Sequence, residues 1–405
     1  MSEWKKVKLG DIASAIQTGP FGSQLHQSDY SDEGTPVVMP KDIVCGKIDV
    51  SSIARVENHH VERLSRHKIK EGDILYARRG DVGKCAYTNK SQTGWLCGTG
   101  CLRVTIDKTK AMPEFVFFQL QKKDTIGWVE NHAIGATMLN LNTSILSDVP
   151  IELPTLSTQY KVASILSRYD SLIENYQKQI KLLEEAAQRL YKEWFIDLRF
   201  PGHENTKIVD GVPEGWEKNC IAELGTVITG KTPSTSKREN YGGSIPFITI
   251  PDMHSGIFPV SSQFLSDIGA NSQKGKFIPA DSLMVSCIGT AGLVCISSRT
   301  CQTNQQINSL VLHDKHFLYF LYYAFLMLKE HLNNIGSNGA TMTNVNKSKF
   351  ESISLLIPTG NLISLYNDKA KPYFKNIRQL SSQIRHLTEA RDRLLPKLMS
   401  GEIAV

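Results

Sequence analysis

The sequence predicts an α+β protein: two β-rich globular regions with short helices, separated by two long helices that form an antiparallel coiled coil, with internal pseudo-twofold symmetry. Two observations lead to this prediction. The second half of the chain repeats the first, and each copy ends on a long amphipathic helical pattern. The repeat places the globular regions at 1–154 and 201–358 and the long helices at 155–200 and 359–405.

The repeat is clearest at the end of each globular region. GATMLNLNTSILSDVPIELP (135–154) aligns with GATMTNVNKSKFESISLLIP (339–358), and eight of these 20 positions are identical at a constant offset of 204 residues. The same offset continues without a gap through 173–195 and 377–399. Because low complexity cannot produce such a match, the chain is interpreted as an internal duplication.

Earlier in each half the alignment is looser but keeps its order. PVVMPKDI aligns with PFITIPDM, and the two halves also share an opening tryptophan and a glycine pair, namely Trp4 with Trp216 and Gly80-x-x-Gly83 with Gly289-x-x-Gly292. Apolar runs such as DILYA, IPFITI, SLMVSCIG and LVCIS are flanked by Gly, Pro and Asn, which is typical of strands between turns. PEFVFFQLQ and FLYFLYYAFLML predict buried helices.

The long helices are predicted from apolar residues at 3-4 spacing, which places them on one helix face. An apolar stripe of three or more heptads needs an apolar partner, and the simplest partner of each helix is the other one. The alternative is that each helix packs only on its own globular region. Ser157 is the expected N-cap of the first helix, and Pro372 is expected to kink the second or to mark its start. The residues expected to pair the helices are Ile173, Ile180, Leu183, Leu190, Ile377, Ile384, Leu387 and Leu394.

The charge distribution argues against a non-specific nucleic-acid binder. The net charge is +6, but residues 1–154 hold 19 basic and 18 acidic side chains, and residues 201–358 hold 12 of each. The excess lies in 359–405, with 8 basic against 4 acidic side chains. Counterion release normally requires a broader basic bias, so any nucleic-acid surface here must be local and polar.

Other bulk features predict a cytoplasmic protein without a membrane partner. The N-terminus has no apolar signal region, and the longest apolar run, Phe317 to Leu328, is too short to cross a bilayer. The eight cysteines form no C-x-x-C pair, so we expect free buried thiols in a reducing compartment and no metal site.

One stretch suggests a nucleotide-dependent enzyme. GTVITGKT, Gly225 to Thr232, fits the phosphate-binding pattern G-x-x-x-x-G-K-[ST]. A working P-loop opens a helix, whereas PSTSKRENYGG follows here, and the aligned IQTGPFGS of the first half has no lysine. The match is interpreted as accidental. Because no other nuclease, methyltransferase or hydrolase motif is present, we expect no catalytic residues and no cofactor in this chain.

Several stretches together resemble the specificity subunits of type I restriction-modification systems. They are GWEKNCIAELGTVITGKTPSTSKRENYGGSIPFITIPDM (215–253), NQQINSL (304–310), the two GATM segments and the ending RDRLLPKLMSGEI (391–403). The resemblance covers the whole chain in the order recognition domain, helix, recognition domain, helix. The first half departs from the pattern, with TGPFGS as its glycine loop and GTGCLRV in place of the NQQIN stretch.

The resemblance implies a non-catalytic subunit in which each target-recognition domain reads one half of a bipartite double-stranded DNA target. The helices would set the gap between the halves and dock two methyltransferase subunits, which bind S-adenosylmethionine. Motor-nuclease subunits using ATP and Mg²⁺ would join the assembly. A stand-alone sequence-specific DNA-binding protein is the alternative reading.

Candidate DNA contacts in the second half follow from side-chain chemistry and position. Direct readout uses Arg, Lys, Asn, Gln, Ser and Thr at base edges. A polar loop follows Gly230, an amide cluster follows Cys301, and two lysines follow the second GATM segment. For the amides the alternative is that they satisfy the backbone of a buried turn, and for the lysines it is a solvated surface. The candidates are Lys231, Thr232, Ser234, Thr235, Ser236, Lys237 and Arg238; Gln302, Asn304, Gln305 and Gln306; and Lys347 and Lys349.

In the first half, basic residues flank the glycine pair and could meet phosphate or guanine, with a solvated charged turn as the alternative. Polar residues also occupy the stretch equivalent to the second-half loop. These candidates are Arg78, Arg79 and Lys84, and Gln17, Thr18, Ser23 and Gln24. Two asparagine pairs, Asn140/Asn142 and Asn344/Asn346, are identical in both halves. Because the halves should read different bases, we interpret them as structural caps before the long helices and expect Asn344→Ala to reduce stability without altering the target.

Overall fold

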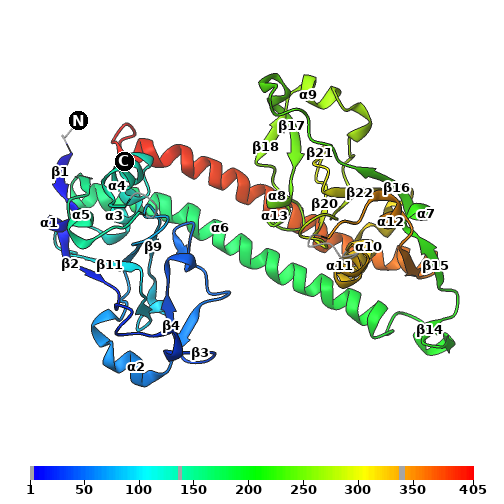
Figure 1. Ribbon diagram of the computed structural model, residues 1–405, viewed down its shortest axis with the longest axis horizontal. Helices are drawn as coiled ribbons and strands as arrows, with labels where there is room; N and C mark the ends of the chain where they lie inside the picture. Colours follow the sequence, from blue (N-terminus) through cyan, green and yellow to red (C-terminus); the bar gives the residue numbers. More distant parts are fainter. Residues whose placement is uncertain (1–3, 136–138, 337–342) are drawn as a thin grey trace. The chain divides into compact units, whose positions relative to one another are not determined.

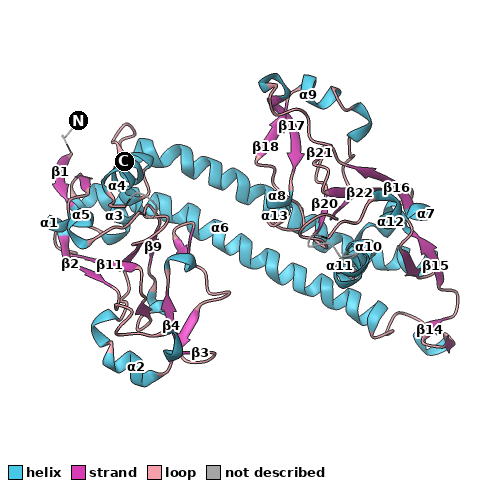
Figure 2. Cartoon of the chain, viewed as in Figure 1, coloured by secondary structure: helices cyan, strands magenta, loops and turns pink. Residues whose placement is uncertain are grey.

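The computed structural model describes residues 4–135, 139–336 and 343–405, so parts of both GATM segments lie outside the described residues. The chain divides into two compact units, shown with their helices and strands in Figures 1 and 2. Unit 1 comprises residues 1–173 and 386–405, and unit 2 comprises residues 174–385. Each unit contains one globular region and a part of both long helices, because the division passes through the helices themselves.

Unit 1 is built on a four-stranded antiparallel sheet in the order β2-β11-β8-β9. A second sheet has the order β10-β4-β7-β3, in which β10 is parallel to β4, and β1-β12 and β5-β6 form two-stranded ladders. Its strands are β1 (Lys5–Lys8), β2 (Ala13–Thr18), β3 (Tyr30–Ser31), β4 (Thr35–Val38), β5 (Ile43–Val44), β6 (Lys47–Ile48), β7 (Ala54–Val56), β8 (Ile74–Ala77), β9 (Cys85–Tyr87), β10 (Leu96–Cys97), β11 (Cys101–Ile106) and β12 (Pro150–Leu153). Its short α-helices are α1 (Leu9–Ile12), α2 (Asn58–Arg63), α3 (Pro113–Leu120), α4 (Lys123–His132) and α5 (Thr143–Ser147).

Unit 2 repeats this arrangement. Its main sheet has the order β16-β22-β19-β20, its second sheet the order β18-β17-β21 with β21 parallel to β17, and β15 pairs with β23. Its strands are β13 (Ile208–Val209), β14 (Val212–Pro213), β15 (Glu217–Cys220), β16 (Gly225–Thr229), β17 (Tyr241–Ile248), β18 (Gln263–Leu265), β19 (Leu283–Ser286), β20 (Val294–Ile296), β21 (Gln302–Thr303), β22 (Ile307–Leu312) and β23 (Ser354–Ile357). Its short α-helices are α7 (Ile221–Leu224), α8 (Ile250–Met253), α9 (Asp267–Asn271), α10 (Leu318–Met327), α11 (Lys329–Gly336) and α12 (Lys347–Glu351). The matching strand orders confirm the predicted α+β fold class and its duplication.

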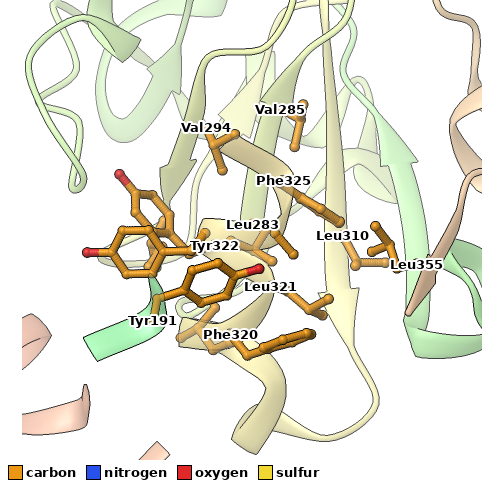
Figure 3. Packing of buried hydrophobic residues seen from close by; sticks show 14 of the residues in the cluster. Tyr191, Leu283, Val285, Val294, Leu310, Phe320, Leu321, Tyr322, Phe325 and Leu355 are labelled. Atoms are coloured by element: carbon orange, nitrogen blue, oxygen red, sulfur yellow. The ribbon is translucent and has the colours of Figure 1, made fainter. Parts of the chain in front are cut away.

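The predicted buried elements are confirmed. Central strands β8 and β19 are buried at every position, which explains why their sequences read as continuous apolar runs rather than alternating ones. Helices α3 and α10 are mostly buried, as the apolar stretches predicted. In unit 2, α10 packs between the main sheet and the long helices: Figure 3 shows Tyr191 beside Phe320 and Tyr322, and the rings of Tyr191 and Phe320 are 5.8 Å apart. This core fixes the sheet whose loops are considered below.

The long helices begin elsewhere than the sequence suggested. Helix α6 spans Leu156–Tyr191 and ends in a π-helical turn, Lys192–Ile196. Ser157 is therefore inside the first turn and is not the N-cap; Thr155 precedes the helix, and its Oγ1 accepts from the Thr158 N–H at 3.4 Å. Helix α13 spans Gly360–Met399 and continues through Pro372, so the expected start at this residue is wrong, while a kink there stays a prediction. Buried Tyr366, Ala370 and Phe374 pack on both sides of this exposed proline, and this packing favours a continuous helix.

Within each unit, segments of both helices pack together. In unit 1, Arg391 of α13 pairs with Asp170 of α6 at 2.6 Å, and Leu394 packs in the apolar cluster that contains Leu166 and Leu398. In unit 2, Phe195, beyond the end of α6, contacts Tyr366 in the first turns of α13, with ring centroids 4.8 Å apart.

The predicted pairing residues follow this division. Ile173 is buried in unit 1, while Ile180, Leu183 and Leu190 pack against the unit 2 core that includes Ile377. Ile384 and Leu387 are half-buried. A coiled coil along the whole length of both helices, and the pseudo-twofold axis, stay predictions. Among the described residues, no helix is long and apolar enough to cross a membrane.

Candidate functional site

In unit 2, the glycine that directly follows strand β16 lies against a neighbouring turn. A Cβ atom on Gly230 would collide with the backbone of Asn304, so only glycine fits here. Beyond it, the Lys231 N–H donates to the Thr303 carbonyl at 2.9 Å. The loop 231–238 and the turn 304–306 are therefore held side by side by backbone contacts.

The loop 231–238 is polar, and hydrogen bonds hold its backbone in place. Thr232 Oγ1 donates to Gln305 Oε1 at 2.6 Å, and the hydroxyls of Ser234 and Ser236 are 2.8 Å apart. Asn240 and Tyr241 donate to the backbone carbonyls of Ser234 and Pro233 at 2.9 and 2.8 Å. Lys231, Thr235, Lys237 and Arg238 are exposed. The backbone of the loop is thus fixed while most of its polar side chains face solvent.

No helix follows the P-loop lookalike. After Lys231 the chain forms this loop and then a single 3₁₀ turn, Arg238–Asn240, so no helix N-terminus is available to hold a phosphate. The expectation that no helix opens after GTVITGKT is therefore confirmed, which argues against a P-loop.

The amide cluster divides into two roles. Gln302 is fully buried: its Nε2 donates to the Ala270 carbonyl at 3.0 Å, and its Oε1 accepts from Gln273 Nε2 at 2.7 Å. We therefore correct its assignment from DNA contact to internal support. Gln305 is exposed and Asn304 and Gln306 are half-buried, with Asn304 Nδ2 donating to Gln306 Oε1 at 3.0 Å. These three remain at the surface beside the loop.

The glycine pair brings a third segment to the same place. The Cys287 N–H donates to the Gln306 carbonyl at 2.8 Å, and the Val345 N–H donates to the Cys287 carbonyl at 2.9 Å. Gly289 has φ +75°, and its N–H donates to the Thr343 carbonyl at 3.0 Å. We call the four segments 230–238, 304–306, 287–292 and 343–346 the unit 2 loop cluster.

Unit 1 has an equivalent junction held by several of the same backbone bonds. A Cβ atom on Gly19 would collide with the Gly98 backbone, as at Gly230 and Asn304. The Arg78 N–H donates to the Gly100 carbonyl at 2.7 Å, and the Leu141 N–H donates to the Arg78 carbonyl at 2.8 Å. Arg78 thus occupies the backbone position of Cys287. The unit 1 loop cluster comprises 19–24, 98–100, 78–84 and 139–142.

The candidate residues of unit 1 differ in how firmly they are held. Gln17 accepts through Oε1 from the Arg103 guanidinium at 3.0 Å, and Gln24 Oε1 accepts from the Phe21 N–H at 3.1 Å. Thr18 is the last residue of β2, half-buried, and Ser23 is exposed. Lys84 pairs with Asp81 at 2.6 Å, which reduces its availability for a phosphate. Arg79 is exposed, and its backbone bridges to Asn140.

Two residues near this cluster were not singled out from the sequence. The exposed ring of Phe21 lies under the Arg78 guanidinium, whose central carbon is 5.7 Å from the ring centroid. Arg103 is buried beside Asp73 and holds both Gln17 and the Lys68 carbonyl. Both residues could have been found from the sequence. Phe21 is an aromatic residue within a polar glycine loop, and Arg103 is the only charged residue of the apolar strand CLRVTI.

The remaining candidates on α12 are engaged locally. Lys347 pairs with Glu351 at 3.4 Å, and Lys349 Nζ donates to the Ile335 carbonyl at 3.0 Å. Asn142 and Asn346 accept from the Ile145 and Lys349 N–H groups at 2.8 and 2.9 Å. The caps are thus confirmed for these two asparagines, although they cap the short helices α5 and α12 and not the long helices.

The first asparagine of each pair has a different role. Asn140 and Asn344 take part in the isolated backbone bridges Arg79–Asn140 and Ile288–Asn344. Asn344 is exposed, so we no longer expect its replacement to reduce stability. We expect that loss from the replacement of Asn346 instead.

The thiols near both clusters are protonated. Burial raises the pKa of Cys97 to about 12 and that of Cys287 to about 11, the latter partly offset by hydrogen bonding to Asn308. A protonated thiol is neither a nucleophile nor a metal ligand. No group of His, Cys, Asp and Glu side chains able to hold a metal ion occurs within 4–135, 139–336 and 343–405. The clusters thus offer hydrogen-bonding and cationic groups at the surface.

Comparison with known proteins identifies the class. The family model for the type I restriction modification DNA specificity domain matches residues 1–185 and 213–361. The chain therefore belongs to this family. It is a specificity subunit of the type I restriction-modification class, and such subunits are non-catalytic.

Individual relatives agree over the full length. The chain is 30% identical to the type I restriction enzyme HindI specificity subunit of Haemophilus influenzae over 469 aligned residues, covering 100% of both chains. It is 27% identical to the MjaIX specificity subunit of Methanocaldococcus jannaschii, covering 100% of this chain and 94% of that one. The crystal structure of a type I restriction-modification system S subunit from M. genitalium shares the fold, with a TM-score of 0.63, 16% identity, and coverage of 98% of this chain and 96% of that one.

Proposed function

We propose that the two loop clusters each read one half of a bipartite double-stranded DNA target. The observation that carries this proposal is that both units build the same backbone junction, while the exposed side chains on it differ. A protein with two equal reading positions and unlike side chains suits a two-part, asymmetric sequence, as a symmetric dimer suits a palindrome.

The proposed contact set consists of candidates on or next to the two clusters that are exposed or half-buried. In unit 2 it comprises Lys231, Thr232, Ser234, Thr235, Ser236, Lys237, Arg238, Asn304, Gln305 and Gln306; in unit 1 it comprises Gln17, Thr18, Ser23, Gln24, Arg78, Arg79 and Lys84. Such amide, hydroxyl and cationic groups are the ones that read base edges and bind phosphates. The nearly balanced charge of both globular regions fits this assignment, because partners can supply much of the phosphate affinity.

The long helices set the distance between the two half-sites in this proposal. Helix α6 has 36 residues and α13 has 40, which correspond to rods of roughly 54 and 60 Å at 1.5 Å per residue. They also dock two methyltransferase subunits, and motor-nuclease subunits join that assembly. S-adenosylmethionine, ATP and Mg²⁺ belong to those partners, and the assembly acts on DNA in the cytoplasm.

Replacement of the loop tests this function. The variant Lys231→Ala/Lys237→Ala is made in the complete complex, together with a control of equal charge change, Lys207→Ala/Lys218→Ala, at exposed lysines of unit 2 outside the cluster. Sequencing of methylated bases should show that the loop variant alters or abolishes one half of the motif only, while the control retains both. An unchanged motif in the loop variant would remove the loop from the contact set.

Co-purification tests the partners. A tagged form of the chain should retain a methyltransferase subunit through a gel-filtration step. A chain that binds its DNA sequence with full affinity but retains no such subunit would instead be a stand-alone DNA-binding protein.

A further inference from the structure

We propose that Arg78 is the residue through which the first recognition region reads a guanine, and that the second region lacks this contact because Cys287 stands at the same backbone position. This inference rests on the proposed function and assigns a base chemistry to one residue of the unit 1 cluster.

The backbone places Arg78 at the centre of that cluster. It follows directly after β8, its N–H donates to the Gly100 carbonyl at 2.7 Å, and its carbonyl accepts from the Leu141 N–H at 2.8 Å. Both bonds join it to other segments of the cluster. A side chain anchored on a rigid strand end is placed more accurately than one on a loop tip.

The Arg78 side chain is oriented by a neighbouring ring, but its N–H groups have no hydrogen-bond acceptor among the described residues. Its guanidinium lies over the Phe21 ring, 5.7 Å from the centroid, which is the geometry of a cation–π contact. The backbone of Phe21 is held in place, because the Gln24 and Leu25 N–H groups donate to its carbonyl at 2.8 and 3.2 Å, and Leu25 is buried. Among the described residues, no carboxylate or carbonyl pairs with the guanidinium, and the buried Nε has no hydrogen-bond partner.

An oriented, half-buried guanidinium without a protein partner is suited to a bidentate acceptor. Guanine presents two acceptors, O6 and N7, on its major-groove edge, and arginine contacts them with two parallel N–H groups. The adjacent Arg79 differs, because it is exposed. Arg79 is therefore suited to a phosphate, which requires charge rather than orientation. The neighbouring Lys84 is already paired with Asp81.

The equivalent position of unit 2 cannot make this contact. Cys287 is buried, forms the same two backbone bonds and has no cationic group. In that unit Gln306 occupies the position of Gly100, so amide groups stand where unit 1 has none. The two regions should therefore differ in chemistry as well as in sequence, with a guanidinium at this backbone position only in the first.

Analogue substitution tests the assignment. Binding of the complete complex to its DNA target is measured with each guanine of the target replaced in turn by 7-deazaguanine, which lacks the N7 acceptor. In the wild type, replacement of one guanine in the half read by unit 1 removes one of the two acceptors and should lower affinity by roughly 2- to 12-fold. In Arg78→Ala, which loses both hydrogen bonds, affinity for the natural target should fall by roughly 5- to 150-fold, and the same replacement should then have no further effect.

Two further variants distinguish a base-specific contact of Arg78 from a general effect of positive charge on DNA affinity. Arg78→Lys retains the charge but not the planar bidentate geometry, so its 7-deazaguanine effect should be smaller than that of the wild type and larger than that of Arg78→Ala. Arg79→Ala should retain the full 7-deazaguanine effect while lowering affinity equally for all sequences and reducing the salt dependence of binding.

The outcomes are distinguishable. If the wild type binds without preference for either half-site, the proposed function itself fails. If sequence preference is present but Arg78→Ala remains sensitive to 7-deazaguanine at every guanine, the assignment of Arg78 is wrong and the function stands. Preservation of the other half of the methylated motif in Arg78→Ala shows that the variant is folded.

Discussion

The two loop clusters share a backbone and differ in their side chains. Unit 1 has Arg78 and the glycines at 98 and 100 where unit 2 has Cys287, Asn304 and Gln306, yet the Arg78 and Cys287 N–H groups donate to the equivalent carbonyls at 2.7 and 2.8 Å. The bonds that define each cluster come from main-chain groups, so they are retained when side chains change. The difference indicates that stability and recognition are carried by separate groups, and the following predictions test that separation.

The largest effects are expected in the cores beneath the clusters. Phe115 in unit 1 and Phe325 in unit 2 are fully buried, and replacement of either by alanine leaves a cavity. Each variant should lower the free energy of unfolding by about 3–5 kcal/mol, measured by urea denaturation. Phe21→Ala is the control, because this ring is 51% exposed and its loss should change stability by about 0.5 kcal/mol or less. Equal losses in all three would contradict the core assignment.

Gln302 tests whether a buried amide supports the loop or reads DNA. Because Gln302→Ala leaves the Ala270 carbonyl and Gln273 with an unmet bond, it should lower the unfolding free energy by about 1–3 kcal/mol. Gln273 also donates to the Lys231 carbonyl at 2.8 Å, so the second half of the motif should weaken while the first is retained. A variant of normal stability with a changed base preference would return Gln302 to the contact set.

The asparagine caps should affect stability equally in both units. Asn142→Ala and Asn346→Ala each remove one cap and should cost about 1 kcal/mol, as thermal or urea unfolding would show. Asn344→Ala is the matched control, since Asn344 is exposed, and should cost about 0.5 kcal/mol or less. None of the three should alter the methylated motif; a change at one base position would show that the duplicated asparagines take part in reading.

The smallest effect is expected at Lys347. Its pair with Glu351 is an exposed i,i+4 contact, so Lys347→Ala should change stability by about 0.5 kcal/mol or less. If the lysine also meets a phosphate, DNA affinity falls equally for all sequences, and the slope of log affinity against log salt decreases by about 1. An unchanged slope would leave Lys347 as a solvated surface residue.

The sequence alone was sufficient to predict those elements whose pattern lies within a continuous stretch of the chain. The duplication, the buried strands and helices α3 and α10 were predicted because their patterns extend over contiguous residues. The sequence did not predict the burial or orientation of a side chain that depends on a contact with a residue far away in the chain. The burial of Gln302 depends on Gln273, 29 residues away, and the orientation of Arg78 depends on Phe21. A helix start at Pro372 was wrongly offered because a local rule places proline at a kink or in the first turn, whereas tertiary packing of Phe374 and Tyr366 favours a helix that begins earlier.

The most direct test of two unlike reading positions is to sequence the modified bases of a genome methylated by the native complex. The account predicts a bipartite motif: two short specific arms of different sequence, separated by a spacer of fixed length without preference, with adenine methylation in both arms. A single contiguous motif, or two arms whose spacing varies from site to site, would contradict it.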